Sequence, residues 1–112
     1  MTKTNIKNLP EGQYFTERMY SDSHPWVVVS RTAKTAKVAF VEVDTDPEWQ
    51  AKQEFYPGGF HGHMANQGEQ TWVFKAINHN YTRTIRLTKN GWSHMGTRYL
   101  EGVAREFHDY NF

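Results

Sequence analysis

The chain is 112 residues long, which is typical of one domain with a small hydrophobic core. Thirteen basic and twelve acidic residues give a formal net charge of +1, so the chain lacks the global positive charge that attracts nucleic acid nonspecifically. It contains no cysteine, which excludes disulfides, cysteine-ligated zinc and a thiol nucleophile, and fits a reducing compartment.

Two further features of composition bear on location and fold. The first six residues contain no apolar run of the kind found in signal peptides, and no segment approaches the roughly 20 apolar residues that span a membrane. We therefore expect a soluble, intracellular protein. Aromatic residues make up 15% of the chain, and they favour strands, stacking surfaces and interfaces.

The first half of the chain predicts three strands. Residues 1–12 form a loose lead-in in this interpretation, and residues 13–20 then alternate with the period of two that is typical of a strand. Residues 21–25 have the composition of a turn. Residues 26–31 and 36–43 are rich in β-branched and apolar side chains, and residues 32–35 would join them as a hairpin.

A break follows at Asp46-Pro47. Asp46 can cap a short helix with Pro47 at its first position, although an irregular arm across the sheet is the alternative. Residues 56–72 then hold four of the eight glycines, two histidines and several side-chain amides. Because glycine lets a backbone approach a ligand and amides can read a polar partner, we expect this loop to contribute to any site.

The second half predicts further strands. Residues 70–77 and 82–89 read as strands separated by a turn at residues 78–80, and Asn90-Gly91 is a strong hairpin signal before residues 92–95. Residues 98–109 favour a final strand pair and tail over a short helix. Six or seven short strands predict an all-β fold, or a β-rich α+β one, as a small antiparallel barrel or sandwich with at most one short helix. Residues 1–112 would form this single domain.

Three kinds of chemistry are weakly supported. His61 and His63 could share a metal, but no third ligand stands at a recognised spacing, so no metal site is predicted. Asp22 and His24 lie beside serines within one turn, whereas the members of a triad usually meet through the fold. The glycines match neither nucleotide-binding motif, although their backbone could still form an anion nest. We therefore predict neither an enzyme nor a cofactor.

A pocket for a nucleotide-like ligand is better supported. Aromatic rings could stack on a base, amides of the glycine-rich loop could read its edge, and arginines could neutralise phosphates. The alternative is that the aromatic residues are core and the arginines lie on a solvated sheet face. The candidate ligand-binding residues are Tyr20, Trp26, Phe60, His63, Asn66, Gln67, Gln70, Arg83, Arg86 and Arg105.

An ordered set of short motifs resembles one protein family. The motifs are Tyr20-Ser21-Asp22, Pro57-Gly58-Gly59-Phe60-x-Gly62-His63, Asn66-Gln67, Gln70-x-Trp72 and Asp109-Tyr110-Asn111-Phe112. Over roughly residues 14 to 112 the chain looks like a family of short, mostly uncharacterised proteins of bacteriophages and prophages. Met64 stands where many relatives would carry cysteine, which speaks against a required thiol.

The resemblance implies expression in a host bacterial cytoplasm and a role against host defence. The chain is also similar to the Thoeris anti-defence sponges. This similarity implies that a homo-oligomer of the protein sequesters a nucleotide-derived immune signal without catalysis. Two alternatives stay open: an anti-CRISPR-type inhibitor that docks on a host defence protein, and a β-domain that binds single-stranded nucleic acid.

Overall fold

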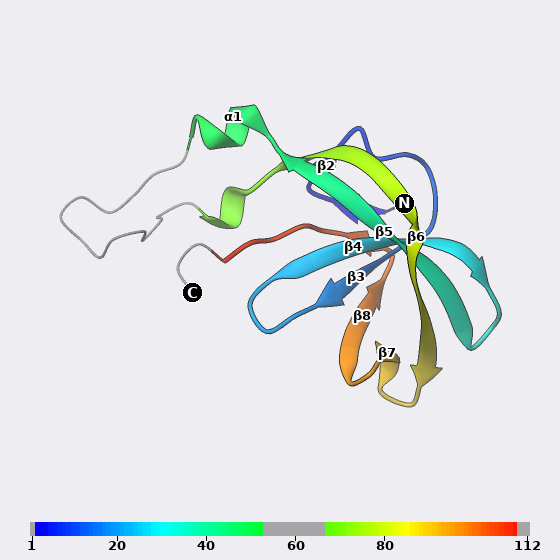
Figure 1. Ribbon diagram of the computed structural model, residues 1–112. Coiled ribbons are helices and arrows are strands. Elements are labelled where there is room, and N and C mark those ends of the chain that lie inside the picture. Colours follow the sequence, from blue (N-terminus) through cyan, green and yellow to red (C-terminus); the bar gives the residue numbers. More distant parts are fainter. Residues whose placement is uncertain (1, 53–66, 110–112) are drawn as a thin grey trace.

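Six antiparallel strands close into a barrel in the computed structural model, which describes residues 2–52 and 67–109 (Figure 1). Each strand pairs with the next along the chain, β8 pairs with β3, and β6 pairs with β7. The all-β prediction is therefore confirmed, in the form of a barrel. The strands are β3 (Tyr14–Arg18), β4 (Ser23–Arg31), β5 (Thr35–Thr45), β6 (Trp72–Thr88), β7 (Gly91–His94) and β8 (Thr97–Glu101).

The N-terminal segment is part of the fold and not a loose lead-in. Strand β1 (Lys3–Thr4) pairs in parallel with β9 (Val103–Ala104), and β2 (Ile6–Lys7) pairs in parallel with the start of β6. Ile6 is only 4% exposed and packs in the core. The prediction for residues 1–12 was wrong here because the segment has no strand pattern of its own and takes its conformation from distant partners.

Alternate residues of the central strands supply two separate cores. One face of β3, β4 and β5 lines the barrel interior, and the opposite face packs against the N-terminal segment. Neighbours such as Trp26 and Val27 therefore belong to different clusters. The barrel cluster contains Phe15, Trp26, Ala36, Val38, Ile85, Trp92 and Tyr99. The second contains Ile6, Tyr14, Val27, Ala39, Val41 and Ala104.

The predicted turns agree with the structure to different degrees. Asn90-Gly91 does connect β6 to β7, and Gly91 has a φ of 105°, a conformation that side chains disfavour. The predicted turn at residues 21–25 was wrong in part, because Ser23 to Pro25 already belong to β4 and pair with β3. The turn predicted at residues 78–80 was also wrong, since β6 runs through it. The local signal survives there as a register shift: Ala39 pairs with Thr82 while Phe40 pairs with Asn78.

The predicted short helix is present as α1 (Pro47–Gln50), which begins after the capping residue Asp46. One further helical turn, η1 (Gln67–Glu69), precedes β6. Within the part of the chain that the structure describes, no helix has the length and apolar character needed to cross a membrane.

Asp46 joins three separate segments of the chain. Its carboxylate lies 2.8 Å from the Lys7 ammonium, accepts a hydrogen bond from the Thr71 hydroxyl at 2.7 Å, and caps the Glu48 backbone N–H at 3.1 Å. These contacts, with that from Lys7 the largest, lower the pKa of Asp46 from 3.8 to about 2. The residue therefore couples α1 to β2 and to the start of β6.

We expect this coupling to weaken in acid. Because the folded-state pKa of Asp46 is below its unfolded value, its contribution is present above about pH 4 and is lost as the pH falls towards 2. In an Asp46→Asn variant, which keeps a capping side chain, the deficit in unfolding free energy relative to the native protein should shrink across that window. Denaturant titrations at stepwise pH would measure it, and a deficit constant from pH 5 to pH 2 would contradict the assignment.

The burial pattern gives a second expectation, with a matched control. Val38 is fully buried in the barrel, whereas Val29 is 47% exposed at the irregularity between Val28 and Ser30. Val38→Ala should lower the free energy of unfolding by about 2 kcal/mol through lost burial and a cavity. Val29→Ala should change it by less than about 0.5 kcal/mol. Equal losses, measured by chemical denaturation, would contradict the assignment of the barrel core.

Candidate functional site

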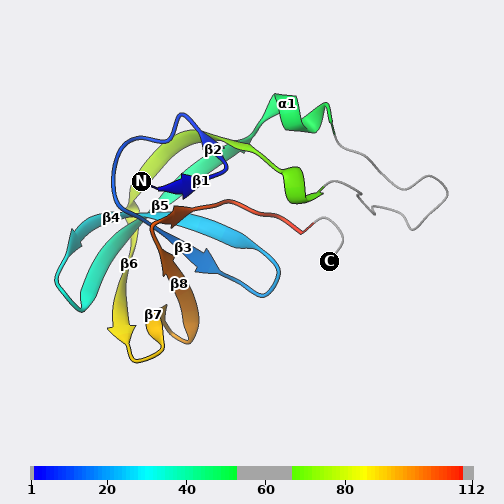
Figure 2. The ribbon, with the colours of Figure 1, turned by 180° about the vertical axis from the view of Figure 1, so that it is seen from behind.

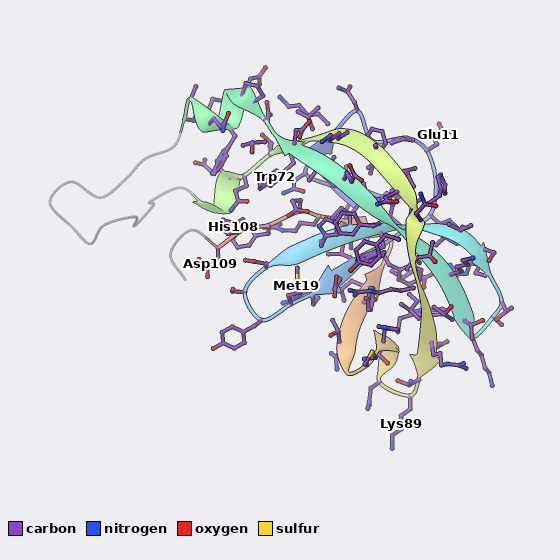
Figure 3. All side chains as sticks on the ribbon, viewed as in Figure 1. Glu11, Met19, Trp72, Lys89, His108 and Asp109 are labelled. Carbon is purple, nitrogen blue, oxygen red and sulfur yellow. The ribbon has the colours of Figure 1, made fainter. Side chains whose placement is uncertain are left out.

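Outside the barrel, the C-terminal half of β5 and the N-terminal half of β6 continue as an arch. The C-terminal segment, residues 105–109, passes beneath this arch and alongside β4, as both ribbon views show (Figures 1 and 2). Figure 3 places Trp72 on the same side of the molecule as His108 and Asp109, at the end opposite Lys89. The space between arch and C-terminal segment is where aromatic and charged side chains gather.

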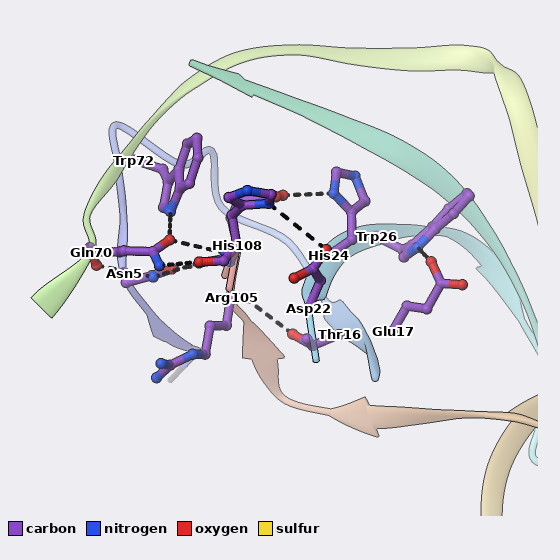
Figure 4. Close-up of polar contacts among 11 residues, drawn as sticks. Asn5, Thr16, Glu17, Asp22, His24, Trp26, Gln70, Trp72, Arg105 and His108 are labelled. Carbon is purple, nitrogen blue, oxygen red and sulfur yellow. Dashed lines mark hydrogen bonds and ion pairs between the residues drawn. The ribbon is translucent and has the colours of Figure 1, made fainter. Parts of the chain in front are cut away.

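Two side-chain amides hold the C-terminal segment in place (Figure 4). Asn5 donates to the Glu106 carbonyl at 2.8 Å and accepts from the Glu106 N–H at 3.1 Å. Gln70 likewise donates to the His108 carbonyl and accepts from the His108 N–H at 3.0 Å. Because a side-chain amide carries the same donor and acceptor as a peptide group, the two residues continue a strand ladder where no strand is present.

The other side of the segment is fixed to β4. Ser23 and Phe107 exchange backbone hydrogen bonds, both at 3.0 Å, and the Asp109 N–H donates to the Asp22 carboxylate at 2.9 Å. The segment is therefore bonded along both edges. This position brings Glu106 to His24, which belongs to β4.

His24 is the centre of the resulting cluster. Its Nδ1 lies 2.6 Å from a Glu106 carboxylate oxygen, in ion-pair contact but without the alignment of a hydrogen bond. The ring stacks on Phe40 with centroids 4.1 Å apart, and Phe40 stacks in turn on Tyr81 at 5.0 Å. The His24 Nε2 atom is buried and has no hydrogen-bond partner among residues 2–52 and 67–109. The imidazole is thus held firmly by one ring face and one carboxylate.

An open cavity of about 280 Å³ lies beside this ring. The rings of His24 and Trp72 both contribute to its lining, and in Figure 4 they stand on either side of His108 beneath the arch. Its lining is a mixture of rings and charges: His24, Phe40, Glu42, Val43, Trp72, Lys75 and Glu106.

A second charged group fills the end of the barrel. The Arg83 guanidinium donates to the Glu17 carboxylate and to the Tyr99 hydroxyl, both at 2.8 Å, and lies 4.6 Å from the Trp26 ring centroid. Glu17 also accepts from the Trp26 indole N–H at 3.1 Å. Burial alone would lower the pKa of Arg83, but these hydrogen bonds raise it above its ordinary value. The charge of Arg83 is therefore compensated inside the fold.

Three predicted binding residues serve the fold instead. Trp26 is fully buried in the barrel, so it has no surface on which a ligand could stack. Gln70 is 3% exposed, and its amide is used by His108 and by the Trp72 indole N–H at 3.2 Å. The Arg83 guanidinium is already paired with the Glu17 carboxylate. Burial makes Trp26 and Gln70 unavailable to a ligand, and the partly exposed Arg83 is taken up by its ion pair; the sequence pattern revealed neither.

The remaining predicted residues that can be placed do not converge. Tyr20 is 95% exposed next to the β3–β4 turn. Arg86 is exposed on β6 where it faces Thr35 and Ser93, and the exposed Arg105 lies 5.3 Å from the Phe107 ring centroid. Of the predicted set, the structure brings together only Trp26 and Arg83 within the part of the chain it describes.

The glycine-rich loop falls largely outside the described residues. Phe60, His63 and Asn66 all lie there, as does His61, and of Gln67 only the backbone in η1 is described. Between residues 2 and 52 and between 67 and 109, no group of three metal-ligating side chains occurs.

A larger cavity of about 720 Å³ lies on the other side of the molecule, beside Glu11 and Gly12. Arg31 is the one cation in its described lining, and it is paired with Glu101 at 2.9 Å and with Gln13 at 3.1 Å. Arg31 also covers the Trp92 ring, 5.2 Å from its centroid. Size alone does not make this the better site, since the one cation of its described lining is already paired and the only aromatic ring of that described lining, Tyr14, is almost fully buried.

Sequence reasoning missed most of the residues around the smaller cavity. His24 was considered beside Asp22 and the neighbouring serines but not as part of a ring-lined cavity, and Phe40, Glu42, Lys75 and Glu106 were not considered as site residues. A period-two reading places His24 with Trp26, and Phe40 with Glu42, on shared strand faces. That signal could have suggested that each strand carries part of a site. It could not have shown that the pairing of β4 with β5 brings the two parts together.

The hydrogen bonds between the Gln70 side-chain amide and the His108 backbone can be tested by a nearly isosteric substitution. Gln70→Glu replaces the donor Nε2 with an oxygen that faces the His108 carbonyl, so we expect a loss of about 2 kcal/mol in unfolding free energy. Amide exchange at His108 should also accelerate. Gln50→Glu, at an exposed position, is the control and should cost little. Equal stability of the two variants would show that the Gln70 amide does not hold the segment.

Comparisons with protein-family models, with curated proteins and with solved structures find no match for this chain.

Proposed function

We propose that this is a non-catalytic binding protein whose ring-lined cavity beneath the arch takes one planar, polar ring of a nucleotide-derived ligand. The observation that carries the proposal is the lining itself. Aromatic rings from β4, β5 and β6 meet there, while two charged residues of the lining, Glu42 and Lys75, have no ion-pair partner among the described residues.

Stacking supplies the affinity in this proposal. A base that packs on an aromatic side chain contributes about 1–3 kcal/mol, which is enough for recognition when a second ring and one or two polar contacts are added. The His24 ring is already held by Phe40 and Glu106, so little side-chain entropy is lost when a ligand packs on it. A cavity of about 280 Å³ is on the small side for a ligand site, which favours one ring over a whole dinucleotide.

Binding without turnover is favoured over catalysis by the chemistry of the lining. His24 and Glu106 have the arrangement of a base and its orienting carboxylate. The described lining, however, contains no hydroxyl or thiol that such a base could activate as a nucleophile. Because the Nε2 atom of His24 is also buried, we assign the pair to positioning the ring.

The biological setting of the proposal comes from the sequence resemblance. A bacteriophage protein of this size that holds a nucleotide-derived immune signal would protect the phage by sequestration, in the manner of the anti-defence sponges that the motifs resemble. The ring-lined cavity supports this setting over docking on a defence protein, because a small cavity suits a small molecule better than a protein surface.

Calorimetry with purified full-length protein provides the test. Mononucleotides, cyclic dinucleotides and cyclic ADP-ribose isomers should include at least one ligand that binds and is recovered intact. Trp72→Leu should weaken that ligand about tenfold or more, while Trp72→Phe should retain most of the affinity. Both variants lose the hydrogen bond from the indole to Gln70 and keep an apolar side chain, so the main difference between them is the aromatic face.

Three results would contradict the proposal. No binding by any member of the panel would remove its basis, and equal loss in the two variants would show that the ring face is not used. Conversion of the ligand, detected by chromatography of the recovered material, would restore an enzymatic function.

A further inference from the structure

We infer that the cavity selects guanine over the other bases, with Glu42 and Lys75 reading the edge of the ring. This inference rests on the proposed function, because it names which ring the same cavity accepts. It depends on the positions of these two charged side chains in the lining and on the lack of an ion-pair partner for either of them among the described residues.

Glu42 is placed on the ring-bearing face of the arch. It lies two residues beyond Phe40 on β5, and residues at this spacing point to the same side of a strand. Its side chain is half-buried and lines the cavity. No hydrogen bond or ion pair links the Glu42 carboxylate to any residue that the structure describes, whereas Glu106, the other carboxylate of the lining, is paired with His24.

Lys75 is directed towards the same cavity by an irregularity in β6. Glu42 pairs with Ala76 and Val43 pairs with Phe74, so Lys75 has no partner on β5. Such an extra residue bends a strand and changes the side to which its side chain points. This explains how Trp72 and Lys75, which are three residues apart, both line the cavity. Like Glu42, Lys75 has no ion-pair partner in residues 2–52 or 67–109.

A carboxylate and an ammonium group on the lining of one cavity match one base in particular. Guanine presents a carbonyl oxygen next to two N–H donors, and an ionised carboxylate can accept both donors while an ammonium group donates to the oxygen. Adenine presents a ring nitrogen acceptor where guanine has a donor, so it would face the carboxylate with a lone pair. Uracil presents a carbonyl oxygen where guanine has its amine, and cytosine presents a ring nitrogen acceptor and a carbonyl oxygen where guanine has its two donors. A site built on hydrogen bonds rejects ligands that leave its charges unpaired.

The first experiment compares bases by calorimetry on the full-length protein. Guanosine monophosphate should bind at least about tenfold more tightly than adenosine, uridine or cytidine monophosphate. Inosine monophosphate, which lacks the exocyclic amine, should fall between guanosine and adenosine monophosphates. Cyclic di-guanosine monophosphate provides a second arm, which separates recognition of a free nucleotide from recognition of guanine within a cyclic dinucleotide.

The second experiment uses variants to assign the contacts. Glu42→Gln and Lys75→Gln should each reduce the preference for guanosine over adenosine monophosphate about tenfold, because each removes one charge-assisted contact. Asp44→Asn, at an exposed position two residues further along β5, is the control and should keep the preference.

The outcomes separate the two proposals. If no base binds, both the proposed function and this inference fail. If adenosine monophosphate binds as tightly as guanosine monophosphate, or if Glu42→Gln weakens both equally, the ring-binding function stands and guanine selection is overturned. A preference for guanine that is lost in both Gln variants and kept in Asp44→Asn establishes it.

Discussion

Strand β6 pairs with three other strands along its length. Its first residues take β2 as a parallel neighbour, its last residues take β7, and β5 accompanies nearly all of it. The pairing of Arg86 with Ser93 closes the barrel, and the pairing of Trp72 with Ile6 covers the far end of the arch. Two register shifts leave Tyr81 and Lys75 of β6 without a pairing partner on β5. The aromatic ring of Tyr81, which stacks on Phe40, and the charged group of Lys75 therefore depart from the regular alternation of the sheet.

The C-terminal segment depends on polar groups rather than on apolar burial. Asn5 and Gln70 meet the backbone of Glu106 and His108 with paired donors and acceptors, and Ser23 does the same from the other side. A buried peptide group without a hydrogen-bond partner costs about 1–3 kcal/mol. These hydrogen bonds therefore allow an extended segment to lie beneath the arch. Their consequence for the site is indirect but decisive, since they set Glu106 against His24.

Charged side chains in this protein fall into two groups with different physical roles. Glu17 and Arg83 are paired inside the barrel end with the Trp26 and Tyr99 polar groups, and removing either partner would leave a partly buried charge uncompensated. Glu42 and Lys75 line a cavity and have no such partners in the described chain. The first pair belongs to the fold. The second pair carries the argument for a ligand because charges beside rings can be satisfied by a bound molecule.

The sequence by itself determined the elements whose signals are local. The strand predicted at residues 13–20, the Asn90-Gly91 turn and the Asp46-Pro47 cap each involve neighbours only, and each is present, the strand over Tyr14–Arg18. Only the tertiary structure decided that Trp26 and Gln70 are buried, that residues 3–7 pair with distant strands, and that His24 meets Glu106. These outcomes depend on register and closure between residues up to a hundred positions apart, which no local pattern encodes.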